Sequence, residues 1–264
     1  MRLLLLALVL ALTAPQDKVT LKFNPKQGDR LSKSEKMEMS IKAKVVFGDQ
    51  TQEFEIEQKE IEKSTLEYKE VVDGKVARTV FKCTENVEEK KAPPTLQWEK
   101  KEKGLHGRRL EIYMKDGKLV REGSEGIEEK LLKKLDLTDR TSLIYPKNAV
   151  GVGESWEVTG EDVRSFLGAD ADLKEASIKM KLLEVKEIEG RRCAVFNAII
   201  DITGKAEGEF DMTMKLDTEV VVWIERGYAL SVKGKGSMSM KGANAQFTMT
   251  GTGPMSLEIT NKIE

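Results

Sequence analysis

Hydrophobic and polar residues alternate along most of this 264-residue chain. In the stretch MEMSIKAKVVF, residues 37–47, every second side chain is apolar, and lysine, glutamate and serine fill most of the places between. A period of two predicts β-strands with one buried face and one solvent face, which is typical of antiparallel sheets. We therefore expect a mainly β protein of long, twisted antiparallel strands. The same alternation recurs in FEIEQ (54–58), SIKMKLLEV (177–185), FDMTMKL (210–216) and MSLEIT (255–260).

Turn residues separate these alternating stretches. An acidic residue followed by glycine is a strong signal for a tight hairpin, because both central positions must tolerate positive φ. We expect hairpins at three such places, which are Asp73-Gly74, Asp116-Gly117 and Glu189-Gly190, and also at Arg226-Gly227, which occupies a comparable place between two alternating stretches.

Helix signals are few. SEGIEEKLLKKLDL predicts one long helix over 124–137, since Ile127, Leu131 and Leu135 fall on one stripe, with glutamates early and lysines late. A short helix is expected to start at Thr159, which forms a capping-box pattern with Asp162.

A strand–turn–strand phrase occurs twice, as LEYKEVVDGKVARTVF (66–81) and LLEVKEIEGRRCAVF (182–196). Flanking pieces match in the same order, which predicts two related halves, 17–138 and 139–264, each a meander of strands in a half-barrel or β-clam arrangement. The alternative is that hairpins merely resemble one another. The flanking pairs are NPKQGDRL with YPKNAVGVGESW, and EIYMKDGKLV with VVWIERGYALSV.

The first residues predict a signal peptide over 1–16. Arg2 precedes an uninterrupted apolar run, 3–12, which is too short for a permanent membrane helix. A buried N-terminal strand or helix is the alternative. We expect a soluble, exported protein, periplasmic or extracellular, that does not span the membrane.

The distribution of charge mainly excludes one class of binding partner. Charged residues make up 34% of the chain, but their signs are finely mixed and the formal net charge is −1. Phosphate binding needs a clustered positive field, so nucleic acid is not an expected partner.

Three motifs carry a resemblance to known proteins. The PKxGD stretch (25–29), VGESW (152–156) and WIERGYALS (223–231) resemble an uncharacterised family of exported bacterial β-rich proteins. More distantly, the long strands with a W-I-x-x-x-G hairpin are similar to the fold of LolA-like periplasmic lipoprotein carriers. That resemblance implies an open half-barrel that shelters acyl chains, although this chain is longer and its repeated phrases predict a duplication.

Catalytic signals are weak, and we expect no enzyme. The single histidine, His106, lies between glycines in KGLHGRR and suits a surface loop better than a catalytic triad. Gly151 and Gly153 lack the context of a dinucleotide fingerprint, and one histidine with two separated cysteines does not make a common zinc site. No cofactor or metal is expected. The carboxylates around Trp156, which are Glu154, Glu157, Glu161 and Asp162, could suggest a glycosidase-like pair, but a solvated turn is the default.

The two cysteines, Cys83 and Cys193, lie in or beside strands that follow the two matched turns. Two alternatives stay open. An exported protein could form a disulfide between them, or each could be a separate buried thiol.

Methionine is the most suggestive residue type. M-x-M pairs place two flexible, polarizable side chains on one strand face, and such a wall adapts to varied apolar shapes. The leading hypothesis is a non-enzymatic protein that binds a lipid or another apolar ligand in a cavity between apolar sheet faces. Ordinary core filling and thioether capture of cuprous copper are the other interpretations of the methionines. For the protein as a whole, the alternatives are a structural or protein-interaction module of the cell envelope with a closed core, and third a hydrolase. The expected wall residues are Met37, Met39, Ile41, Met180, Met212, Met214, Met238 and Met240.

Overall fold

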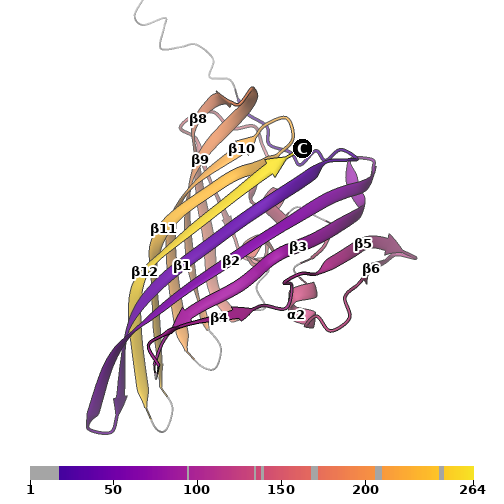
Figure 1. The fold of residues 1–264 in the computed structure, drawn as a ribbon. Helices are drawn as coiled ribbons and strands as arrows, with labels where there is room; N and C mark the ends of the chain where they lie inside the picture. Colours follow the sequence, from indigo (N-terminus) through magenta and orange to yellow (C-terminus); the bar gives the residue numbers. More distant parts are fainter. Residues whose placement is uncertain are drawn as a thin grey trace, which may run out of the picture.

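A computed structural model describes residues 18–93, 95–133, 135–137, 140–167, 172–205, 210–243 and 247–264. The predicted signal peptide lies outside the described residues. The described chain forms one large, open antiparallel sheet (Figure 1), which confirms the expected fold class. Its strands are β1 (Arg30–Phe47), β2 (Gln50–Val72), β3 (Lys75–Lys91), β4 (Trp98–Glu102), β5 (Arg109–Lys115), β6 (Lys118–Glu122), β7 (Ser155–Thr159), β8 (Asp172–Ile188), β9 (Arg191–Lys205), β10 (Asp211–Trp223), β11 (Tyr228–Ala243) and β12 (Thr248–Ile263).

The strand order is β6-β5-β3-β2-β1-β12-β11-β10-β9-β8-β7, with β4 paired to β3 off this path. Strands β1 to β6 and β7 to β12 therefore make two meanders that run in the same direction across the sheet. The meanders meet where β1 pairs antiparallel with β12. The sheet curls so strongly that β8, β9 and β10 lie behind β1, β2 and β3 in the view of Figure 1.

The two-residue hairpins follow the turn residues. Each acidic residue and its glycine take positive φ, for example 51° at Asp73 and 72° at Gly74, and the pairs at 116–117 and 189–190 do the same. These three hairpins are confirmed. The fourth turn is longer than expected, because β10 ends at Trp223 and β11 begins at Tyr228.

The long helix expected over 124–137 is wrong. Among the described residues of this segment, α2 (Glu129–Leu132) alone is helical, and the 3-10 helix η1 (Arg140–Ile144) follows later. Gly126 has φ +74° and Glu128 is extended, so the backbone leaves the helical region twice before α2 begins. The apolar stripe still packs, but as part of a cluster around Leu110 rather than as one face of a helix.

The short helix is confirmed as α3, although it starts at Glu161 rather than Thr159. Gly160 precedes it with φ +67°. Val163, fully buried, points from α3 into the main hydrophobic cluster.

The two meanders begin with the same backbone contacts. In each half, a glycine of positive φ (88° at Gly28, 89° at Gly153) donates its N–H to a carbonyl on the second strand of the meander. That strand residue returns its N–H to the acidic residue after the glycine. The division of the chain into two related halves remains a prediction. A duplication of one ancestral half would give both halves these matched contacts. The bonds are Gly28 N–H to Tyr68 O (2.8 Å), Tyr68 N–H to Asp29 O (2.9 Å), Gly153 N–H to Leu182 O (2.7 Å) and Leu182 N–H to Glu154 O (3.0 Å).

Candidate ligand-binding face

One face of the curled sheet carries the main hydrophobic cluster, and we call it the inner face. It includes Ile41 of β1, Met238 of β11 and Met180 of β8, and it packs against α3. All eight predicted wall residues belong to this one cluster. Three are buried, which are Ile41, Met180 and Met238, and five are partly exposed, which are Met37, Met39, Met212, Met214 and Met240.

Glycine faces methionine along the β11–β12 pair. A glycine opposite a long side chain leaves room for that side chain and lets the two backbones coil closely. A Cβ at Gly236 would collide with the backbone oxygen of Lys215, and one at Gly253 would collide with that of Ser40. The glycines are therefore required by the curvature of the sheet. The register pairs are Gly236 with Met255, Met238 with Gly253, Met240 with Gly251, and Gly242 with Met249.

One end of the inner face is covered and the other is more open. Val19, Ile144 and Val163 bury one end, while burial falls along β10 from Val222 toward Met212. At the open end three phenylalanines form an aromatic rim. Phe47 and Phe210 lie with ring centroids 5.5 and 6.5 Å from that of Phe247, and Phe47 is 45% exposed.

A band of charged and amide side chains continues the inner face across β1, β2 and β3. We call it the polar strip, and its position follows from register, since Met37 lies opposite Glu60 on β2. Its ionic side chains are only a quarter to a third exposed, for example 24% at Glu62. The strip consists of Lys33, Glu35, Glu60, Glu62, Asn86 and Lys103.

The polar strip is densely hydrogen-bonded. Lys33 Nζ lies 2.5 Å from Glu35 Oε2 and 3.3 Å from Glu62 Oε1, and Lys103 Nζ lies 2.8 Å from Glu60 Oε2. Burial alone would lower the pKa of Lys33, but the two glutamates together raise it above its ordinary value. Asn86 donates its amide to Glu62 Oε2 at 3.2 Å. The strip therefore carries fixed charges directly beside the apolar wall.

Sequence reasoning missed the polar strip, although a signal was present. The alternation that places Phe54 and Ile56 inward continues in the same phase to Gln58, Glu60 and Glu62. Extending that phase along β2 would have put these polar residues on the inner face. Glutamates were instead assigned to the solvent face by residue type.

The other candidate residues take structural roles. His106 accepts the Asn86 backbone N–H at Nδ1 (3.2 Å). Trp156 donates Nε1–H to Ile144 O (2.9 Å), Glu154 accepts the Gly151 N–H at Oε2 (2.9 Å), and the Trp156 ring packs edge-on against Phe196. Within the described residues no group of three or more His, Cys, Asp or Glu side chains is arranged to hold a metal ion.

The two cysteines are free, buried thiols. Cys83 packs in the cluster of Phe81 and Leu110, whereas Cys193 packs with Val195 on the opposite face of the sheet. The disulfide alternative is therefore not the one observed. Burial raises the pKa of Cys83 to about 12, with the nearby Glu62 carboxylate adding to the shift, and burial raises the pKa of Cys193 as well.

Two of the quoted motifs meet in space in a cluster that we call the Asp29 clamp. Arg226 Nη2 pairs with Asp29 Oδ1, and the Tyr228 hydroxyl donates to Asp29 Oδ2 at 2.7 Å. The Arg226 guanidinium also lies 5.6 Å from the centroid of the Trp223 ring. Burial, followed by this hydrogen bond, raises the pKa of Tyr228. The sequence motifs were visible, but their pairing was not.

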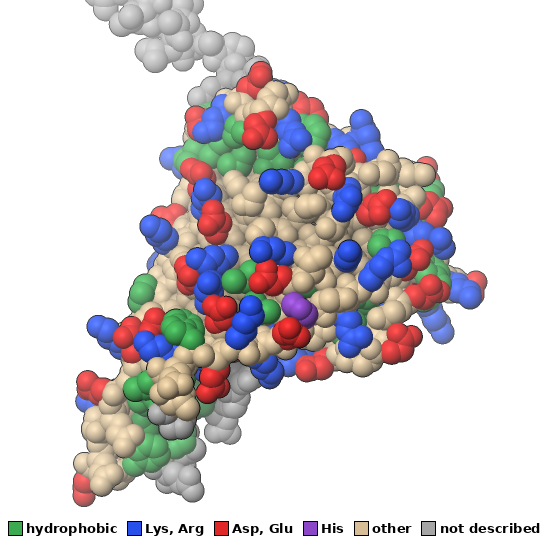
Figure 2. Space-filling model, in the orientation of Figure 1, with side chains coloured by type: hydrophobic (Ala, Val, Ile, Leu, Met, Phe, Trp, Pro, Cys, Tyr) green, Lys and Arg blue, Asp and Glu red, His purple; other side chains and the backbone are tan. Residues whose placement is uncertain are grey.

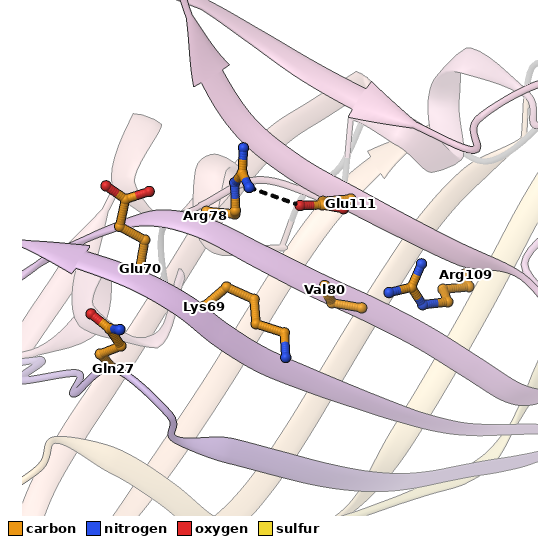
Figure 3. A pocket seen from close by; sticks show the side chains of 7 residues that line it. All are labelled: Gln27, Lys69, Glu70, Arg78, Val80, Arg109 and Glu111. Carbon is orange, nitrogen blue, oxygen red and sulfur yellow. Dashed lines mark ion pairs between the residues drawn. The ribbon is translucent and has the colours of Figure 1, made fainter.

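A shallow pocket of about 590 Å³ lies on the outer face over β2, β3 and β5 (Figure 3). One of its cations is paired with an anion, since Arg78 Nη1 lies 3.4 Å from Glu111 Oε1. A second pocket, about 610 Å³, lies over β1 and β10 to β12 and is lined largely by lysines and acidic residues. Figure 2 likewise shows acidic and basic side chains mixed over the face in view. Charged residues predominate in the lining of both pockets, so the apolar candidate is the inner face itself.

No protein-family model matches the chain, and no curated protein sequence matches it. Among solved structures, it is similar to one titled "Lipid-protein interactions in lipovitellin", with a TM-score of 0.47 and 8% identity. That likeness covers 90% of this chain, which spans 26% of the lipovitellin chain. A DUF1329 family protein from Desulfovibrio piger matches with a TM-score of 0.13 and 10% identity, over 90% of this chain and 85% of that one. Both TM-scores lie below 0.5, so neither likeness indicates a function for this chain.

Proposed function

We propose that this protein holds a lipid or another apolar molecule against its inner face and catalyses no reaction. One observation carries the proposal. Three methionines of the main cluster, Met212, Met214 and Met240, stay partly exposed toward the end of the sheet that carries the phenylalanine rim, and Met37 and Met39 are partly exposed farther back along β1. Flexible thioether side chains on such a surface can reshape around varied alkyl groups.

The driving force is removal of apolar surface from water. At ~25 cal/mol per Å², covering ~200 Å² of methionine and phenylalanine surface contributes about 5 kcal/mol before the cost of immobilising the ligand. On β12, Gly253 lies opposite Met238 and Gly251 lies opposite Met240, so these two methionines meet no side chain directly across that strand pair.

Export is part of the proposal. It rests on the apolar run behind Arg2 at the start of the sequence. Among the described residues, no helix combines the length and hydrophobicity needed to cross a bilayer. Expression of the full sequence in a bacterium, followed by cell fractionation and mass measurement of the product, checks this point. A cytoplasmic protein that keeps its first 16 residues contradicts it.

The ligand proposal is tested by native mass spectrometry and by fluorescence of N-phenyl-1-naphthylamine, a neutral apolar probe. We expect a co-purifying lipid-sized mass and a rise in probe fluorescence. The double variant Met212→Gln/Met214→Gln should weaken probe binding about tenfold, because it places amides on the apolar wall.

The matched control is Met114→Gln, which makes the same change at an exposed methionine of β5. It should bind the probe like the unaltered protein. Equal binding by the double variant and the control contradicts the assignment of the wall.

The second candidate is a structural or protein-interaction module with a closed core. The burial of Ile41, Met180 and Met238 favours it, because these side chains already fill part of the inner face. Absence of any bound lipid, together with no fluorescence gain, would support this module over the lipid-binding proposal.

A further inference from the structure

The polar strip lies beside the apolar wall rather than on a separate surface. Across the β1–β2 pair, Met37 is opposite Glu60 and Met39 is opposite Gln58. Side chains in such pairs have Cβ atoms about 4.5–5.5 Å apart. A molecule lying on the wall therefore reaches the strip within one strand spacing.

The donors of the strip are already engaged within it. Lys33 points to Glu35 and Glu62, and Lys103 points to Glu60. Two neighbouring side chains outside the strip also donate to it, with Ser64 Oγ 3.2 Å from Glu62 Oε1 and Gln58 Nε2 2.9 Å from Glu60 Oε1.

One hydrogen-bond acceptor of the polar strip has no donor. Asn86 is 8% exposed, and its Oδ1 is buried without a hydrogen-bond partner. A buried unpaired carbonyl costs free energy unless something donates to it. Two acidic residues neighbour Asn86 in the sheet, since Glu62 lies opposite it on β2 and Glu88 follows on the same side of β3.

These observations deepen the proposed function and rest on it. We infer that the ligand is an amphiphile whose alkyl chain lies on the methionine wall and whose head group donates hydrogen bonds to Asn86 Oδ1. A primary ammonium fits best, because it offers three donors and a positive charge beside Glu60 and Glu62. An anionic head meets the same carboxylates and is disfavoured.

Four probes that share a twelve-carbon chain test this inference. Dodecylamine, dodecyltrimethylammonium, dodecanol and dodecanoate compete with N-phenyl-1-naphthylamine, each below its micelle concentration. Dodecylamine should displace the probe at least tenfold better than dodecyltrimethylammonium, which has the charge but no N–H donor. Dodecanoate should be the weakest competitor.

The outcomes separate the two proposals. If neither the fluorescent probe nor any of the four amphiphiles binds, the proposed function fails. If the amphiphiles bind with equal strength, or dodecanoate binds best, the apolar wall stands and the head-group inference is overturned.

Two variants of Asn86 then test whether this residue causes the preference for dodecylamine. Asn86→Leu removes the acceptor and should abolish the tenfold preference for dodecylamine, while Asn86→Asp keeps an acceptor, adds charge and should retain or increase it. A purely structural role would make both variants weaken all four probes alike. Asn197→Leu, on the outer face of β9, is the matched control and should leave the order unchanged. The wild-type series decides the inference even if a variant fails to fold.

Discussion

Single side chains on the inner face are fixed by what lies opposite them across the sheet. Gly236 faces Met255 and Gly253 faces Met238, so each long side chain has a neighbour without a Cβ. These glycines are needed where strands approach closely, because at both positions a Cβ would overlap backbone atoms of the next strand. The curvature of the wall therefore depends on individual glycines.

Replacing Gly236 by alanine should destabilise the protein by about 3 kcal/mol or more, since overpacking against backbone cannot be relieved by a rotamer change. Urea unfolding monitored by circular dichroism measures the loss. Ser239→Ala, at an exposed position of the same strand, should change stability by under ~0.5 kcal/mol. Equal stability of the two variants would contradict the close approach.

Cys83 is a second residue whose environment sets its chemistry. Its pKa is about 12 in the folded protein against 9.0 for an ordinary thiol. Above pH 9 the unfolded chain loses this proton while the folded chain keeps it. Stability contributed by the neutral thiol is thus present below about pH 9 and is lost as the pH rises toward 12.

We expect the free energy of unfolding to fall between pH 9 and 10 by up to ~1.4 kcal/mol per pH unit for each buried thiol. The variant Cys83→Ala should flatten this decline, which chemical denaturation at several pH values can follow. Iodoacetamide at pH 8 should modify neither cysteine in the native protein and both in denaturant. Rapid labelling of native Cys83 would contradict the burial of this thiol.

At the scale of elements, local pattern predicted the strands and hairpins well but overstated one helix. The apolar spacing of Ile127, Leu131 and Leu135 suits a helix, yet Gly126 at φ +74° stops one from starting early. These side chains pack with Leu110 and Phe81 without a continuous helix. Burial against a neighbouring cluster, rather than helical propensity, therefore determines this segment.

The Asp29 clamp is the element-scale contact with the clearest test. It joins the segment before β1 to the loop between β10 and β11, with both charged side chains buried. Asp29→Asn leaves the Arg226 guanidinium buried without its counter-charge and should cost about 3–5 kcal/mol.

The double variant Asp29→Leu/Arg226→Met removes both charges and should regain much of that stability. Thermal unfolding of the single and double variants measures the coupling between the two side chains. Additive losses would show that the pair does not act as a unit.

For the whole molecule, the seam between β1 and β12 joins two meanders into one sheet. The main cluster crosses this seam, since Ile41 and Met37 of the first meander pack in it with Met180 of the second. The predicted boundary between residues 138 and 139 therefore separates chain segments that share a core.

Expressed separately, residues 17–138 and 139–264 should each fail to give a cooperative unfolding transition, because each leaves an unpaired edge at the seam and an uncovered apolar face. Mixing the two fragments should restore a single transition. Calorimetry of each fragment and of the mixture shows whether a cooperative unfolding transition is present. Two independently stable fragments would contradict a shared core.

The sequence by itself determined the strands, three of the tight turns and the shared sheet face of eight apolar residues, because alternation and positive-φ turn residues act over a few neighbouring positions. Only the tertiary structure decided the polar strip and the Asp29 clamp. The clamp joins residues 197 positions apart, and the strip needs the register of β1, β2 and β3 to bring its members together. Strand pairing and sheet curvature are set by contacts between distant segments, so no local pattern specifies which polar side chains face inward together.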